Sequence, residues 1–455
     1  MDGWSIYKIE ECLYEVIFMI DTEYVVKKAI SFGADEVSAI YVEREMKQTR
    51  FSNSKLDIML NYQENALSLF LSKGKKTLFT TVRNFDNLER TIENFVKLLD
   101  KMPENKDFYG LNTKKQSYRS HEPDGTLINL EDLNYLTKRA IEGAQDKGAK
   151  RVAGVMYHFV EDVSLSTNYN NANDRNTGIY FSVRAFNENG FPGQSAFHTS
   201  HHSLLNDFDP YYVGEEAADY ALLMDVPKEG KEGNFDILFH PLCFGSLISY
   251  SAPMASAYSV ETGMSFFTDT LGKKIGSEFF TLYDDPTLES GVGYRLFDDE
   301  GTETKKVTII EKGIVKNYLH NFSTAKRFET ETTGNAGIIN PQPWQPVMEN
   351  GHRSYQDILG EMKKGLFIVN TWYTRFQDYR NGDFSTIPRD GIFYVENGEI
   401  IESWKGIRIS DNLPRIFSSI KEVSSERIQV KWWDEVMPSL IPYVLVSDVK
   451  ITKAK

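Results

Sequence analysis

The feature that most limits how this chain can fold is a long uncharged stretch within the segment from Asn234 to Leu288. A short apolar strand at residues 237–239 precedes residues 241–260, which contain no Asp, Glu, Lys, Arg or His. A helix over Leu242–Val260 would have no charged face, and such helices are buried on most sides. We therefore expect a helix enclosed by its own domain, kinked at Pro253 because proline lacks a backbone N–H.

The overall charge of the chain excludes one class of partner. The 455 residues carry a formal net charge of −14, and the acidic residues are spread along the sequence. Contact with nucleic-acid phosphates needs a basic surface, so no nucleic-acid partner is expected. A hydrophobic content of 41% and an aromatic content of 13% are typical of a folded globular protein rather than a disordered one.

Cysteine usage and hydropathy indicate the compartment. The two cysteines, Cys12 and Cys243, imply no disulfide framework, which fits a reducing cytoplasm. No apolar run reaches the length of a membrane span. The first residues mix acids with apolar side chains and lack a basic start, so they do not form a secretory signal. We expect a cytoplasmic protein without a membrane partner.

The first half of the chain repeats one pattern, an amphipathic helix followed by several strands. The helices are expected at Thr22–Phe32 and Asn129–Lys147, each followed by a glycine. Grouped rather than alternating strands are typical of an α+β fold. Short strands between Gly, Asn and Asp turns predict a β-rich second half. The expected division is an N-terminal extension at 1–21, an α+β domain of repeated helix plus antiparallel strands at 22–230, and a C-terminal β-rich domain containing the buried helix at 231–455.

Within the first repeat we expect three separate strands and a hairpin. The strands are placed at residues 37–43, 55–61 and 66–73, and the Lys-Gly-Lys-Lys sequence at 73–76 predicts a hairpin turn. The Asn-rich residues 168–177 are expected to form a connecting loop. Residues 103–125 are polar with few apolar side chains, so they predict a long surface loop.

An ordered set of short motifs resembles the TldD/TldE (PmbA) family, whose members were once called modulators of DNA gyrase. No single motif is specific, but the set follows the family order from Met19 to Ile451. The motifs are Gly263-x-Ser265-Phe266, Leu271-Gly272, Asp284-Asp285-Pro286-Thr287, Phe297-Asp298-Asp299-Glu300-Gly301, Thr332-Thr333-Gly334-Asn335-Ala336 and Gly382-Asp383-Phe384-Ser385.

The resemblance also identifies what is missing. In TldD, the metallopeptidase branch, the buried helix carries His-Glu-x-x-x-His, and these positions correspond to Ile248, Ser249 and Pro253 here. The third zinc ligand of that branch is a late cysteine, whereas this chain has no cysteine after Cys243 and offers Lys431, Trp432 and Trp433 in that region. Zinc hydrolysis needs about three protein ligands and an open position for water. No catalytic or metal-binding residue is therefore predicted in this chain.

Two histidine groups remain as alternatives for a relocated metal site. His240 lies three residues before Cys243, and His198, His201 and His202 precede Asp207 and Asp209. A ligand pair without a third partner is a weak zinc signal. We favour a polar residue at a strand–helix junction for His240, and an exposed hairpin for the histidine cluster.

Paired acids and turn residues are candidates for a cleft. Asp284 precedes Asp285, and Asp298 belongs to an Asp-Asp-Glu sequence. Neighbouring residues on a strand point in opposite directions, so turn formation is favoured over a catalytic carboxylate pair. The candidates for lining a cleft or contacting a peptide are Ser265, Asp284, Asp298, Glu300, Asn335 and Asp383.

The resemblance implies a TldE-like, non-catalytic subunit of a cytoplasmic metallopeptidase that degrades unfolded or flexible peptides. A TldD-like partner would supply the zinc and the general base, and this chain would hold no cofactor. Two other hypotheses stay open. One is an autonomous hydrolase that uses a relocated site; the other is a non-enzymatic peptide-binding scaffold that forms a homodimer in isolation.

Overall fold

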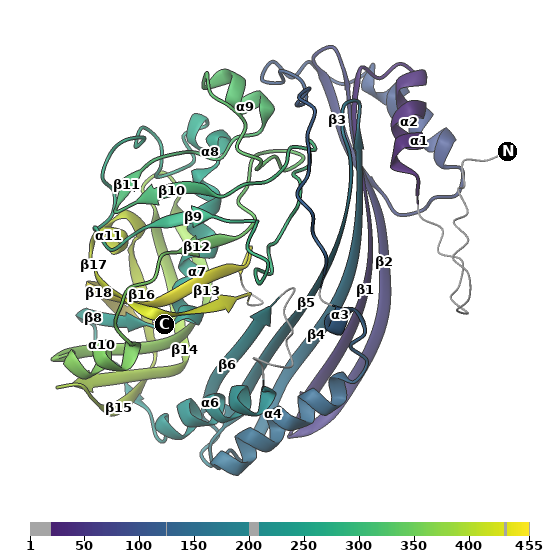
Figure 1. Cartoon of the computed structure of the whole chain (residues 1–455). Helices are drawn as coiled ribbons and strands as arrows, with labels where there is room; N and C mark the ends of the chain where they lie inside the picture. Colours follow the sequence, from purple (N-terminus) through teal and green to yellow (C-terminus); the bar gives the residue numbers. More distant parts are fainter. Residues whose placement is uncertain (1–19, 124, 200–208, 432–434, 455) are drawn as a thin grey trace.

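The computed structural model describes residues 20–123, 125–199, 209–431 and 435–454. In these ranges the chain forms an antiparallel sheet of six strands and a larger mixed sheet of twelve strands (Figure 1). Most helices of the first half lie against its own sheet, and the helix at residues 210–223 also packs on the second half, where Tyr220 shares an apolar cluster with Leu238 and Phe367. This arrangement confirms the predicted α+β fold with a β-rich second half.

The N-terminal sheet has the spatial order β3-β2-β1-β4-β5-β6. Its strands are β1 (Glu36–Ser52), β2 (Lys55–Lys73), β3 (Lys76–Val82), β4 (Arg151–Thr167), β5 (Asn171–Phe186) and β6 (Pro192–Thr199). The accompanying helices are α1 (Thr22–Ser31), α2 (Leu88–Leu99), α3 (Gly125–Ile128), α4 (Leu133–Lys147) and α6 (Pro210–Leu223).

One face of this sheet packs on the helices. Side chains alternate along a strand, so Val37, Tyr41 and Phe51 of β1 point to the same face. The first two belong to the apolar core that includes α1 and α2 residues, and Phe51 belongs to the core that includes α4 and α6 residues. The opposite face is left for the second half of the chain.

Two sequence expectations for this sheet are wrong. Residues 55–73 form one strand rather than two, and the expected loop at 168–177 is mostly strand, because β5 begins at Asn171. The polar interruption Gln63-Glu64-Asn65 is tolerated because this end of β2 is exposed or half-exposed on both faces. The Asn-rich segment likewise pairs along β4, with Asn173 opposite Ser164.

The C-terminal sheet has the path β11-β10-β9-β12-β18-β8-β13-β14-β15-β7, with β16 beside β14 and β18, and β17 beside β18. Its strands are β7 (Lys228–Glu229), β8 (Gly233–Phe239), β9 (Leu282–Asp284), β10 (Val307–Glu311), β11 (Ile314–Val315), β12 (Pro346–Met348), β13 (Lys364–Asp378), β14 (Asp383–Glu396), β15 (Glu399–Lys405), β16 (Ile407–Asn412), β17 (Ile420–Val430) and β18 (Ser439–Lys453). The helices are α7 (Pro241–Ser251), α8 (Ala257–Glu261), α9 (Phe322–Arg327), α10 (Tyr355–Glu361) and α11 (Leu413–Ser418).

The uncharged stretch forms the buried helix that the sequence predicts. All of α7 is buried except its partly exposed Tyr250. A short 3₁₀ turn at Ala252–Ala255 separates α7 from α8 and contains Pro253. The missing N–H of proline explains why the α-helical hydrogen bonds stop here. The expected kink is confirmed, and it divides the predicted helix into two.

Residues 103–123, which we call the strap, join the two halves of the molecule. Asn112 donates a hydrogen bond to the Thr302 hydroxyl at 2.9 Å, and the Tyr118 hydroxyl donates to the Gly301 carbonyl at 2.7 Å. Phe108 and Leu111 are buried. The expected loop, with mostly exposed residues, is confirmed, but a few apolar and hydrogen-bonding side chains also anchor the strap between the domains.

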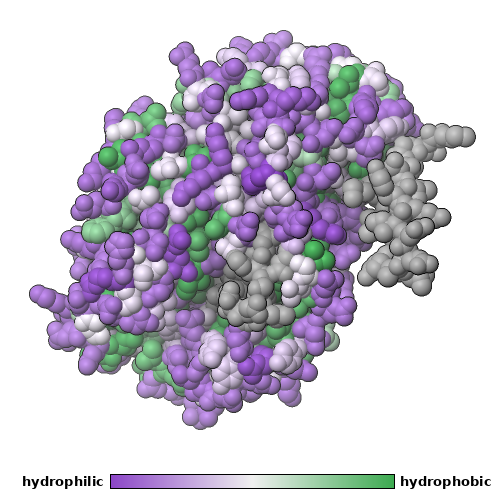
Figure 2. All heavy atoms as spheres, viewed as in Figure 1, coloured by the Kyte–Doolittle hydropathy of each residue, from purple (hydrophilic) through white to green (hydrophobic). Residues whose placement is uncertain are grey.

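No helix in the described ranges is long and apolar enough to cross a membrane. On the face shown in Figure 2, hydrophilic residues predominate and hydrophobic ones form smaller areas between them.

Candidate functional site

The positions that the resemblance equates with the family zinc motif lie inside the C-terminal core. Ile248 and Ser249 of α7 have no exposed surface. Ile248 packs within the main apolar cluster of this domain. The Ser249 hydroxyl accepts a hydrogen bond from the backbone N–H of Met437 at 3.1 Å, so it fixes the segment before β18. A hydrocarbon side chain, an engaged hydroxyl and the Pro253 ring occupy these positions.

These side chains do not fit a zinc ion. Isoleucine and proline side chains have no lone pair to donate, and zinc prefers imidazole, thiolate or carboxylate ligands. Among the described residues, no three His, Cys, Asp or Glu side chains are grouped in a way that could hold a metal ion. We therefore derive no metal-dependent step for this helix.

His240 lies at the predicted strand–helix junction, but its buried Nε2 atom has no hydrogen-bond partner among the described residues. Its Nδ1 atom caps α7 by accepting the Leu242 N–H at 3.1 Å. Burial among aromatic rings, including the Tyr443 ring with its centroid 4.9 Å away, lowers the pKa of His240 to about 3. Burial raises the pKa of the Cys243 thiol, whose sulfur lies 3.9 Å from the Thr371 hydroxyl. A neutral thiol is a poor nucleophile and a poor zinc ligand, so this pair is unsuited to either role.

The second histidine group falls largely outside the described residues. His201, His202 and Asp207 lie outside them, as does the side chain of His198. Cys12, Trp432 and Trp433 are outside them too. Asp209 caps α6, because its Oδ1 atom accepts the Tyr211 N–H at 2.9 Å.

Asp284 and Asp285 have different surroundings. Asp284 is fully buried and accepts hydrogen bonds from the backbone N–H groups of Trp344 and Gln345 and from Nδ2 of Asn335. Burial is the main cause that raises the pKa of Asp284 to about 7. Asp285 accepts from the Thr287 hydroxyl at 2.6 Å and forms the predicted turn.

The Asp-Asp-Glu sequence is a turn with buried carboxylates. Asp298 accepts the backbone N–H groups of Glu300 and Thr302 at 3.0 and 2.8 Å. Its other oxygen accepts the Ala336 N–H at 3.0 Å. Burial is the main cause that raises the pKa of Asp298 and of Glu300; the charge of Asp299 adds to the shift of Asp298, and the charge of Asp298 adds to that of Glu300.

Two further candidates are also held by local hydrogen bonds. Ser265 donates to the Met254 carbonyl at 2.6 Å and accepts the Phe267 N–H at 3.0 Å. Asp383 is partly exposed and accepts from Asn412 Nδ2 at 2.9 Å. Peptide contact stays a prediction for all six candidates. Of these, Ser265, Asp284, Asp298 and Asn335 are at most 1% exposed.

A cavity of about 260 Å³ lies where the two halves of the molecule meet. It is lined by β1, β2 and the strap from the first half and by α8, α9 and loop residues from the second half. Of the six predicted candidates, only Glu300 lines it. We call this space the interdomain cavity. Its wall includes Phe70, Phe108, Leu111, Tyr258, Ile338 and Pro341.

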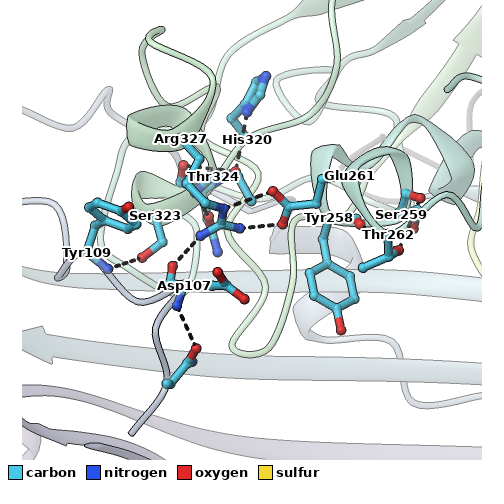
Figure 3. A network of polar contacts seen from close by, with 12 residues as sticks. Asp107, Tyr109, Tyr258, Ser259, Glu261, Thr262, His320, Ser323, Thr324 and Arg327 are labelled. Carbon is cyan, nitrogen blue, oxygen red and sulfur yellow. Dashed lines mark hydrogen bonds and ion pairs between the residues drawn. The ribbon is translucent and has the colours of Figure 1, made fainter. Parts of the chain in front are cut away.

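Arg327 at the end of α9 ties three segments together beside the interdomain cavity (Figure 3). Its Nε atom donates to Glu261 Oε2 at 2.8 Å, and Nη2 pairs with the other oxygen of the same carboxylate. Its Nη1 atom donates to the Asp107 carbonyl of the strap. The nearby Tyr109 N–H donates to the Ser323 hydroxyl at 3.0 Å. The amino-acid sequence gave no signal for this network, because its members are up to 220 residues apart.

Comparisons with known proteins agree with the motifs. Residues 232–453 match the model of the PmbA/TldA metallopeptidase C-terminal domain. A metalloprotease from Methanocaldococcus jannaschii is 33% identical over 224 residues, which cover 46% of this chain and 48% of that protein. A PmbA metalloprotease homologue from Buchnera aphidicola is 31% identical over 237 residues, covering 49% and 51%. The matched region thus spans about half the length of these curated relatives.

Solved structures extend the similarity of the fold over nearly the whole chain. TldE from Thermococcus kodakarensis superposes with a TM-score of 0.83 at 20% identity, covering 94% of this chain and 99% of that one. A Thermotoga maritima protein described as a modulator of DNA gyrase gives 0.81 at 23% identity, covering 94% and 99%. At such identities the structures show the fold alone. The family model and the curated relatives therefore show that residues 232–453 carry the PmbA/TldA metallopeptidase C-terminal domain, the domain that defines the family whose motifs this chain resembles.

Proposed function

We propose that this chain is a TldE-like, non-catalytic subunit of a heterodimeric zinc metallopeptidase that degrades unfolded or flexible peptides in the cytoplasm. The observation that carries the proposal is the replacement of the zinc-motif positions by Ile248, Ser249 and Pro253, of which the first two are fully buried. Metal-dependent hydrolysis would then belong to a TldD-like partner that contributes zinc and a general base.

The chemistry of α7 supports this division of roles. A zinc hydrolase holds its ion with about three ligands and leaves one position open to a water molecule. Ile248 instead extends the apolar packing of the helix, and the Ser249 hydroxyl already accepts a hydrogen bond from the Met437 N–H. The helix thus supports the fold of a domain whose relatives are named metalloproteases.

The partner is expected to form a permanent complex with this chain. Permanent interfaces between subunits typically bury about 2,000 Å² or more. The acidic chain has no expected role with nucleic acid or membranes, and a homodimer is the alternative state of the isolated chain.

The test compares this chain alone with this chain mixed with a partner that carries His-Glu-x-x-x-His. We expect neither stoichiometric zinc nor peptide hydrolysis from the isolated chain, and both from the purified complex. The matched control is a partner whose motif Glu is replaced by Gln, which should keep zinc and lose hydrolysis.

Two results would overturn the proposal. Stoichiometric zinc in the isolated chain, lost on His198→Ala or His240→Ala substitution, would establish the relocated hydrolase site. A stable homodimer that binds unfolded peptides and ignores every such partner would establish the scaffold hypothesis.

A further inference from the structure

We propose that the interdomain cavity binds a small primary ammonium group attached to an apolar body, with the Glu300 carboxylate as its anchor. This cavity is distinct from the α7 positions that correspond to the zinc motif. The inference does not depend on the proposed heterodimer, because every contact that it uses lies within this chain.

Glu300 supplies an acceptor without a donor. Its side chain is one of those that line the interdomain cavity, yet the residue is only 8% exposed. One oxygen, Oε2, accepts the Phe322 N–H at 2.9 Å. The other, Oε1, has no hydrogen-bond partner within the described ranges. A ligand donor that reaches this oxygen would supply the hydrogen bond that the protein does not.

The charges around Glu300 select a cation. Asp298, Asp299 and Glu36 are the acidic groups that act on it electrostatically. The two nearby arginines are already engaged, Arg295 with Asp299 and Arg327 with Glu261. With both arginines engaged, a positive ligand beside Glu300 would stabilise the ionised form of this acid.

The walls select an organic cation rather than a metal ion. Calcium and magnesium need six or more oxygen ligands, and no group of three acidic, histidine or cysteine side chains in the described ranges is arranged for a metal. Phe70, Phe108 and Leu111 supply apolar surface from the N-terminal half. An ammonium group has three donors, and an attached hydrocarbon body would cover this surface. The volume of about 260 Å³ suits a ligand of a few apolar carbons.

The experiment is isothermal titration calorimetry of the full chain with 2-phenylethylammonium chloride. The matched neutral probe is 2-phenylethanol, which has nearly the same shape. We expect saturable binding of the ammonium compound and no measurable binding of the alcohol. Equal binding of the two probes, or no saturable binding of the ammonium compound, would overturn the proposal.

Two variants test whether the Glu300 carboxylate binds the ammonium group. Glu300→Gln keeps an acceptor for the Phe322 N–H but removes the charge, so ammonium binding should weaken by about tenfold or more. Glu331→Gln changes an exposed acid that does not line the interdomain cavity, and it should bind as the wild type does. Wild-type affinity in a folded Glu300→Gln chain contradicts the assignment.

Proton release provides a readout that needs no variant. Burial and the neighbouring acids raise the pKa of Glu300, and a bound ammonium group lowers it again because it favours the ionised form. Titrations near neutral pH in two buffers of different ionisation enthalpy should therefore show net proton release. Binding without proton release would contradict the ion pair.

The source of the ammonium group can be separated in the same assay. A tetrapeptide amide that begins with Phe and its N-acetylated form serve as the probes. Binding of the free peptide alone supports a peptide amino terminus as the ligand, whereas binding of phenylethylammonium alone supports a free amine.

Discussion

The segment around α7 and the interdomain cavity differ in packing, because the first is a filled core and the second encloses space. Around α7 the Ser249 hydroxyl is bonded to the Met437 N–H, and Ile248 is surrounded by apolar side chains. At the cavity, Glu300 is nearly as buried but lies beside a space of about 260 Å³. The contrast teaches that the uncharged helix supports a packed core, whereas the junction between the domains leaves space beside a buried acid.

The largest effect should come from placing a polar side chain in the α7 core. Ile248→Asn buries an amide without designed partners and removes apolar packing, which should lower the free energy of unfolding by about 3–5 kcal/mol. The matched control is Ile339→Asn, because Ile339 lines the cavity and is 75% exposed. Urea denaturation measures both variants, and equal losses would remove the contrast between the two regions.

The next effect concerns the network at the cavity wall. Arg327→Met removes a charged pair with Glu261 and the bond to the strap carbonyl, so stability should fall by about 1–3 kcal/mol. Lys326→Met alters the neighbouring exposed residue and should change stability little. Limited proteolysis of the strap should accelerate only in the first variant; unchanged cleavage would show that the strap is held by other contacts.

A pH series tests the buried Asp284. A carboxyl whose folded pKa is raised to about 7 stays protonated in the folded protein while the unfolded chain ionises near pH 4. Its contribution to stability is present below pH 4 and is lost as pH rises toward 7. The Asp284→Asn variant should flatten this decline in urea midpoints measured from pH 4 to 7. Asp285→Asn, at the partly exposed turn, serves as the control, and a wild-type slope in Asp284→Asn would refute the assignment.

The smallest expected signal is the labelling of Cys243 by a thiol reagent. In a Cys12→Ser background the buried thiol should react only as fast as the protein opens, because burial raises its pKa and blocks access. A cysteine introduced at exposed Asn105, on the cavity wall, should react quickly in the same background. Fast native labelling of Cys243 would show that the α7 region opens readily.

The buried helix and its kink could be predicted because their signals are local. An uncharged run reports burial directly, and Pro253 marks the interruption of the helix. The lengths of β1 and β2 could not be predicted in this way, because polar residues at Gln63–Asn65 conceal a strand whose outer end is exposed. The strand continues through these residues because they pair with β1, and this pairing cannot be read from the sequence of β2 alone.

The residues of the candidate site could be predicted only in part from the sequence. Glu300 was selected from a turn motif, and the structure places it at the cavity wall. Asp284 and Asn335 were selected in the same way, but they hydrogen-bond each other at 2.7 Å within the core. The Arg327 network and the contacts of the strap with the second half were not predicted, because isolated anchors such as Phe108 and Leu111 give no periodic signal.

The strap also affects how the molecule is assembled during synthesis. Arg119 bonds to the Thr304 carbonyl across 185 residues of sequence, and Tyr118 bonds to the Gly301 carbonyl across 183. Contacts at such separations raise the contact order and slow folding. A nascent N-terminal half can make the contacts of its strap with Glu36 and Asn170, but those with Gly301 and Thr304 form only after the loop near residue 304 has been translated.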